Sequence, residues 1–162
     1  AVPPDRLAAA FGRMPAARYP RHNPRPRRLD WTTLPPTPGR AFGSLVAAVD
    51  ADGNEVGGIV LPELAVPLAA HTGWNLRHPD IGGAEQLLVF AGATIPLART
   101  RAEREASGDP RPSIAERYAS REAYLEQVRE AARALAREGY LLPDDVPLSV
   151  AAGGRLWDHF TR

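Results

Sequence analysis

The sequence predicts an α+β fold with one small antiparallel β-hairpin, several helices and a long N-terminal arm. Three observations carry this prediction: prolines gather near the N-terminus, a turn-rich segment follows, and helix-start motifs occur in the second half. The 162 residues correspond to about one ordinary domain. With 44% hydrophobic and 24% charged residues, a collagen-like or wholly disordered chain is excluded.

Residues 1–40 form the predicted arm. They contain nine of the 17 prolines, and eight arginines against two acidic residues, so their net charge is +6. Because proline fixes φ and lacks a backbone N–H, we expect an extended segment with at most one short helix, near residues 5–11. Residues 41–162 carry twelve arginines against seventeen acidic residues, a net charge of −5, and form the predicted α+β lobe.

A β-hairpin is predicted over residues 43–61. Apolar residues lie at both ends of this segment, and the turn-forming residues 50–54 lie between them. The turn superficially resembles a calcium loop, but Gly53 is fourth instead of sixth, and Leu61 occupies the twelfth position, where an EF-hand needs glutamate. A hairpin turn therefore explains the segment better. Residues 71–86 are expected to be mostly loop.

Helices are predicted in the C-terminal half from their capping residues. Thr100 and Ser113 each precede a glutamate by three residues, which is the spacing of a capping box. The strongest helix covers residues 121–138, with Ser120 as its N-cap and an apolar stripe along one face. A last helix is expected within residues 144–160.

Cysteine and lysine are both absent from the sequence. Their absence excludes disulfides, thiolate nucleophiles and Schiff-base lysines, which leaves His, Ser, Asp, Glu and Arg for chemistry. No apolar run reaches the roughly 20 residues that span a bilayer, and no signal-peptide pattern is present. We therefore expect no membrane association and a cytoplasmic location. Ala1 in place of methionine indicates a segment or a processed product.

No residue of this chain is predicted to be catalytic. A serine hydrolase needs a sharp strand-to-helix elbow, usually G-x-S-x-G, and none of the five serines lies in one. Cofactors and metals are not expected either, because the only cluster of candidate ligands is His71, His78 and Asp80. These three lack the helical spacing that preforms a metal site, so a surface turn explains them better.

Four residues are the candidate ligand-binding group: His71, Trp74, Asn75 and Arg77. An indole, an amide and a guanidinium lie close together beside a glycine, a composition typical of a pocket wall that orients a polar or anionic ligand. The alternative is structural. In that interpretation Trp74 fills the core, Asn75 binds turn amides and Arg77 pairs with Asp80.

The basic arm allows two interpretations. Its arginines could bind nucleic-acid phosphates while Tyr19 or Trp31 stacks on bases, or they could pair with carboxylates of an acidic protein. Prolines alternate with the arginines, no nucleic-acid-binding motif follows, and the acidic remainder repels a polyanion. The acidic protein is therefore the favoured partner of the arm.

Several segments occur in a characteristic order along the chain. They are VDADGNE (49–55), GIVLPELAVPL (58–68), TGWNLR (72–77), IPLART (95–100), SGDPRPSI (107–114) and ERY (116–118). Together they resemble the C-terminal part of the large "alpha/beta hydrolase domain" family of bacterial esterase-like proteins. The resemblance covers about residues 49–160, and it continues more weakly at residues 18–21.

This resemblance implies a carboxylic-ester hydrolase whose serine, acid and histidine lie upstream of the matching region. The chain would then be a C-terminal lobe, in which His71 stands where the family usually has tyrosine. It would lack the triad and pack on, or line the pocket of, a catalytic part supplied in cis or in trans, with a small ester as substrate. The alternative is a stand-alone, non-enzymatic binding module whose arm engages an acidic protein or a nucleic acid. Whether the chain is itself an enzyme stays open.

Overall fold

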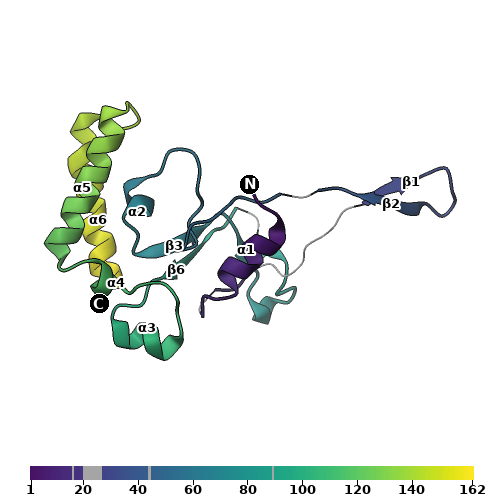
Figure 1. Cartoon of the computed structure of the whole chain (residues 1–162), viewed down its shortest axis with the longest axis horizontal. Helices are drawn as coiled ribbons and strands as arrows, with labels where there is room; N and C mark the ends of the chain where they lie inside the picture. Colours follow the sequence, from purple (N-terminus) through teal and green to yellow (C-terminus); the bar gives the residue numbers. More distant parts are fainter. Residues whose placement is uncertain (16, 20–26, 44, 89) are drawn as a thin grey trace.

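The computed structural model describes residues 1–15, 17–19, 27–43, 45–88 and 90–162, and it confirms the α+β class (Figure 1). The helices are α1 (Pro4–Phe11), α2 (Pro62–Ala65), α3 (Arg101–Ser107), α4 (Ile114–Arg117), α5 (Arg121–Arg137) and α6 (Val146–Phe160), with the 3-10 turns η1 (Pro79–Ile81) and η2 (Pro143–Asp145). The strands are β1 (Arg27–Asp30), β2 (Thr37–Ala41), β3 (Ala69–Thr72), β4 (Asn75–Leu76), β5 (Leu87–Leu88) and β6 (Ala93–Pro96).

The strands pair in antiparallel, two-stranded sheets of the order β1-β2, β3-β6 and β4-β5. In the central sheet, Ala69 faces Pro96 and His71 faces Thr94, and β3 is buried except at His71. The expectation that residues 71–86 are mostly loop holds for most of this range, but the end of β3 and all of β4 are strand. The partners of these strands lie far along the chain, so the local pattern gave no indication of the pairing.

The hairpin predicted over residues 43–61 forms only at its turn. Asp50 Oδ1 accepts the backbone N–H groups of Asp52 and Asn54, both at 2.9 Å, and Val49 and Glu55 form an isolated bridge. Beyond this bridge the prediction is wrong, because residues 56–61 belong to no described strand and their side chains are mostly exposed. Antiparallel pairing instead occurs in the three sheets described above.

The larger hydrophobic cluster lies where α5 and α6 pack against each other and against the segment around α2. Ser120 Oγ accepts the N–H of Ala123 at 3.2 Å to start α5, and Gly139, with φ +82°, follows its end. The predicted helices at residues 121–138 and within 144–160 are thus confirmed. The buried members of the cluster are Val66, Leu68, Leu97, Ile114, Tyr118, Tyr124 and Val128. Among the described helices, none is long and apolar enough to cross a membrane.

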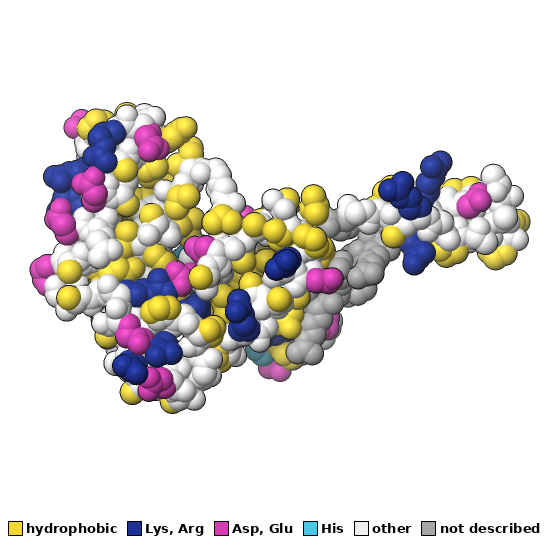
Figure 2. Space-filling model, in the orientation of Figure 1, with side chains coloured by type: hydrophobic (Ala, Val, Ile, Leu, Met, Phe, Trp, Pro, Cys, Tyr) yellow, Lys and Arg dark blue, Asp and Glu magenta, His cyan; other side chains and the backbone are white. Residues whose placement is uncertain are grey.

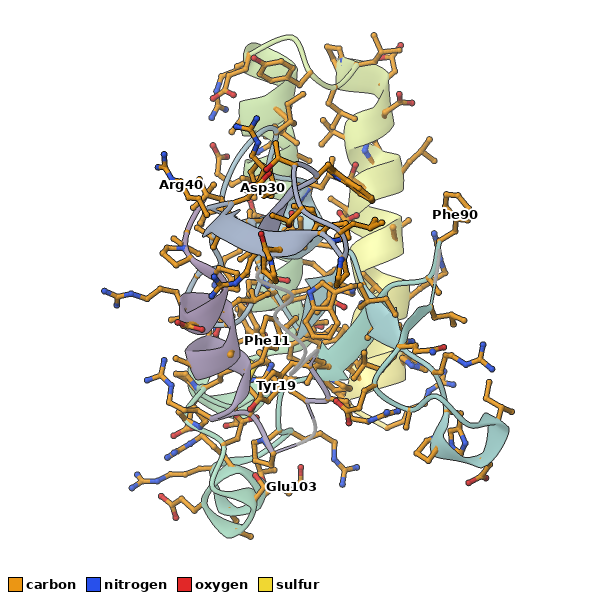
Figure 3. All side chains as sticks on the ribbon, turned by 90° about the vertical axis from the view of Figure 1, so that its right-hand side faces the viewer. Phe11, Tyr19, Asp30, Arg40, Phe90 and Glu103 are labelled. Atoms are coloured by element: carbon orange, nitrogen blue, oxygen red, sulfur yellow. The ribbon has the colours of Figure 1, made fainter. Side chains whose placement is uncertain are left out.

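A second, smaller cluster joins α1 to the central sheet. Phe11 and Met14 are buried there with Ala70 of β3 and Ile95 of β6, and Phe11 lies inside the molecule in Figure 3. The short helix expected near residues 5–11 is confirmed as α1. By contrast, β1 and β2 form a ribbon that projects from the body (Figure 1). The division of the chain at residue 40 stays a prediction, and the proline-arginine run at 20–26 lies outside the described residues.

The connector between α3 and α4 is held by a buried ion pair. Arg111 Nη2 lies 2.7 Å from Asp109 Oδ2, and the guanidinium also donates to the carbonyl oxygens of Ile95, at 3.2 Å, and Pro96, at 3.0 Å. Burial opposes ionisation of Asp109, but the hydrogen bonds from Arg111 outweigh it and lower the pKa of this carboxyl. The pair therefore fastens the connector to β6.

Candidate functional site

The four candidate binding residues lie on one segment that leaves the central sheet. His71 is in β3, Trp74 lies between β3 and β4, Asn75 begins β4, and Arg77 directly follows it. The pairing of β4 with β5 places Asn75 opposite Leu88. The segment is therefore held between the central sheet on one side and β5 on the other.

His71 is fixed through both its backbone and its ring. Its N–H donates to Asn54 Oδ1 at 2.8 Å, and its Nδ1 lies 3.3 Å from the Thr94 hydroxyl on the neighbouring strand. Asn54 is itself buried, and its amide donates to the carbonyl oxygen of Ala69 at 3.3 Å. These contacts hold the half-buried imidazole in place.

Trp74 takes part in the smaller hydrophobic cluster. Its indole meets the Phe11 ring edge-on, with ring centroids 5.1 Å apart and an interplanar angle of 77°. This geometry is favourable for aromatic pairs. The structural interpretation of Trp74 thus has a physical basis in this contact, whereas its contact with a ligand stays a prediction.

Asn75 and Arg77 both stabilise backbone nearby. Asn75 donates to the Gly92 carbonyl at 3.2 Å and accepts the N–H of Leu76 at 2.8 Å. Arg77 donates through Nε to the Gly82 carbonyl at 3.1 Å and through Nη2 to that of Ile81 at 3.3 Å. The expected ion pair between Arg77 and Asp80 is therefore wrong, because the guanidinium closes the turn around η1 through carbonyl oxygens.

Asp80 lies beside His78 instead of binding Arg77. Its carboxylate lies 3.4 Å from His78 Nδ1, and both side chains are well exposed. The same ring nitrogen accepts the N–H of Asp80 at 3.3 Å. The surface turn predicted for this segment is thus present, with the histidine rather than the aspartate as the capping side chain.

An exposed apolar surface borders this segment, and we name Ile81, Leu87, Leu88 and Phe90 the apolar edge. Their exposed fractions are 62%, 53%, 41% and 105%, respectively. Phe90 has φ +61°, a conformation that is rare for a bulky residue, and its ring points away from the body (Figure 3). This edge was not predicted from the sequence. The run of four apolar residues at 87–90, directly after the segment expected to be loop, was the available signal.

The serine hydroxyls that the structure describes all serve local backbone. Ser113 and Ser120 cap helices, Ser107 donates to the Arg104 carbonyl at 3.0 Å, and Ser149 donates to that of Asp145 at 3.3 Å. No hydrogen bond joins a serine to a histidine within these ranges, and Ser44 and His22 lie outside them. The described residues therefore contain no assembled serine nucleophile and base.

The same ranges contain no group of three or more His, Asp or Glu residues that could hold a metal ion. His71 is engaged by Thr94, whereas His78 and Asp80 lie in the exposed turn at η1. The chemistry available near the candidate segment is thus hydrogen bonding and apolar contact.

Comparisons with known proteins agree with the resemblance seen in the sequence. A search of curated proteins and a search of solved structures each returned no match. A family model described as "Alpha/beta hydrolase domain" matches residues 9–151, which is most of the chain and includes every candidate binding residue. The chain therefore belongs to the alpha/beta hydrolase domain family.

Proposed function

We propose that the chain is a lobe of a carboxylic-ester hydrolase that carries no Ser/acid/His triad of its own. It packs through the apolar edge on a catalytic part supplied in cis or in trans. The observation that carries the proposal is Phe90, which combines full exposure with a strained backbone conformation in a family of hydrolases. Strain of this kind persists at functional contacts, and a cluster of exposed apolar side chains marks an interface.

The candidate binding residues would then face the ester pocket from the side of the lobe. They lie on β3 and β4, and β4 is hydrogen-bonded to β5 of the apolar edge. Docking through that edge brings Asn75 and Arg77 close to the catalytic part. We propose that His71, Trp74, Asn75 and Arg77 line the acyl or alcohol side of the pocket and orient a small ester.

Ester hydrolysis by the isolated chain is the first test. The purified chain is incubated with p-nitrophenyl butyrate and, separately, with a fluorophosphonate that labels activated serines. We expect neither turnover nor labelling. Turnover that one Ser→Ala variant abolishes would place a nucleophile in this chain, and turnover that survives five such changes would contradict any serine mechanism.

Reconstitution is the second test. The chain is mixed or fused with a hydrolase part from the same source that carries a G-x-S-x-G elbow, and turnover of p-nitrophenyl butyrate is measured. We expect turnover to require both parts and to be lost in Leu88→Asp/Phe90→Asp. Ile59→Asp is the matched control, because Ile59 is an exposed apolar residue outside the apolar edge. Equal loss in the control would contradict docking through this edge.

A further inference from the structure

The ribbon formed by β1 and β2 is exposed along its whole length. Every residue of both strands is exposed to solvent, and the ribbon projects from the body in Figure 1. A two-stranded ribbon that packs on nothing is marginally stable in water. Its sequence is also unsuited to a free surface, because Trp31 is 75% exposed, Leu34 95% and Phe42 59%. A covering partner would account for both properties.

The charges on the ribbon define what that partner must carry. Arg28 and Arg40 form no ion pair or side-chain hydrogen bond within the described ranges, and Arg27 donates only to the Gly39 carbonyl at 3.3 Å. The single acidic residue, Asp30, accepts hydrogen bonds from Thr32 instead of neutralising an arginine. Figure 2 shows basic side chains on the projecting ribbon. The partner surface must therefore combine carboxylates with apolar side chains.

This chain presents such a surface at its other end. Residues 138–148, which we name the acidic turn, comprise the connection from α5 to α6 and the first three residues of α6. Tyr140, Leu142 and Leu148 are 59%, 68% and 66% exposed there. The carboxylates of Glu138, Asp144 and Asp145 form no ion pair within the part of the chain that the structure describes, and that of Asp145 does not cap α6. Apolar groups and uncommitted charges of the opposite sign thus match those of the ribbon.

The two surfaces lie far from each other within one molecule. The ribbon and the helical pair α5–α6 lie at opposite ends of the long axis (Figure 1). We propose that the ribbon of one copy docks on the acidic turn of a second copy. Trp31 and Phe42 then bury apolar area against the turn, while Arg28 and Arg40 pair with its carboxylates. This inference is independent of the ester-hydrolase proposal, because it uses neither the apolar edge nor the candidate binding residues.

Assembly of the full chain as a function of concentration tests the proposal. Sedimentation velocity and light scattering are recorded from micromolar to submillimolar concentration at low and moderate salt. We expect a mass above the 17.5 kDa of one chain that grows with concentration and falls as salt is raised. The emission of Trp31 shifts to the blue as copies associate, and this shift is absent in Trp31→Ala. A mass of 17.5 kDa under all conditions overturns the proposal.

Charge reversal identifies the two surfaces. Arg28→Glu/Arg40→Glu and Glu138→Arg/Asp144→Arg are each expected to remain monomeric, and an equimolar mixture of the two variants is expected to assemble again. Assembly of either variant alone at the wild-type concentration, or no recovery in the mixture, overturns the proposal. Circular dichroism confirms that each variant is folded.

A matched control separates docking from a simple change in net charge. Arg13→Glu/Arg155→Glu changes the net charge by the same amount at exposed arginines outside both surfaces, and it is expected to assemble like the wild type. A chain that stays monomeric but binds single-stranded oligouridine through Arg28 and Arg40 would assign the ribbon to nucleic acid and overturn the proposal.

Discussion

At the scale of single residues, the buried ion pair of Asp109 and Arg111 stabilises the connector between α3 and α4. The Arg111 side chain is 1% exposed and that of Asp109 is 7% exposed. Asp109→Ala leaves the guanidinium buried without its carboxylate, so we expect the free energy of unfolding to fall by about 3–5 kcal/mol. Urea denaturation measures the change. Glu105→Ala, which removes the partner of an exposed arginine, is expected to change it far less, and equal losses would contradict this account.

Tyr124 carries a buried hydroxyl that has no hydrogen-bond partner in the described structure, while its ring packs against Tyr118 and Trp157. Burial, with smaller contributions from Tyr118 and Glu63, raises the pKa of this phenol. Tyr124→Phe is expected to leave stability unchanged or raise it by up to about 1 kcal/mol, because nothing is lost with the hydroxyl. Tyr118→Phe is the matched comparison. It removes the 2.9 Å bond to the Pro67 carbonyl and is expected to destabilise by about 1 kcal/mol.

The ionised carboxylate of Glu116 stabilises the start of α4, so the free energy of unfolding depends on pH in the acid range. The N–H of Ser113, the Arg104 guanidinium and the Ser113 hydroxyl lower the pKa of this carboxyl from 4.5 to about 2. Because the folded-state pKa is the lower one, its stabilisation is complete above pH 4.5 and is lost as the pH falls toward 2. Glu116→Gln should therefore show a smaller loss of unfolding free energy between pH 5 and pH 2.5. An unchanged pH dependence would contradict this role.

Local contacts of single residues could be predicted, whereas distant ones could not. Ser113 forms the complete capping box that its spacing to Glu116 indicates. Arg117, in contrast, pairs with Asp52 across 65 residues, at 2.8 Å between Nη1 and Oδ2. Only tertiary packing brings such partners together. The Arg77 contacts are local, with Ile81 and Gly82, but they depend on the backbone path of the turn around η1, which residue types alone do not specify.

At the scale of elements, the crossing of α5 and α6 depends on a residue without a side chain. A Cβ placed on Gly153 would lie 3.2 Å from Val128 Cγ1 and 3.3 Å from its Cγ2. Gly153→Leu therefore forces the helices apart, and we expect it to lower the free energy of unfolding by about 1–3 kcal/mol. Leu148→Ala, at an exposed position of the same helix, is the control for thermal or urea unfolding. A fully stable leucine variant would show that the helices do not pack closely here.

The helices were predictable because their signals are local. Caps, apolar stripes and a terminal glycine lie within a few residues of each other, and α5 and α6 occur where these signals place them. Strands depend on their partners. Residues 56–61 have strand-like composition, but no described strand pairs with them, whereas β3 and β6 pair across a long intervening segment. The helices around the candidate segment were therefore predictable, whereas the strand pairing that holds it was not, and the binding role of its residues stays a prediction.

At the scale of the whole molecule, the buried core and the exposed apolar side chains lie in different parts of the chain. The helical pair and the central sheet contain the two hydrophobic clusters, while the apolar edge and the ribbon leave large apolar side chains exposed. The net charge of +1 is the sum of a basic N-terminal stretch and an acidic remainder, which nearly cancel. Family membership spans both, because the matching residues 9–151 include the ribbon and most of the helical pair.

Removal of the ribbon tests this division. Residues 27–41 are replaced by a short Gly-Ser linker, and urea unfolding and sedimentation are compared with those of the intact chain. No residue of β1 or β2 is buried, so we expect the free energy of unfolding to change by less than about 1 kcal/mol. Assembly between copies should be lost, because the docking side chains Arg28, Trp31 and Arg40 are gone. A shortened chain that unfolds would show that the ribbon supports the body, and one that still assembles would show that copies meet elsewhere.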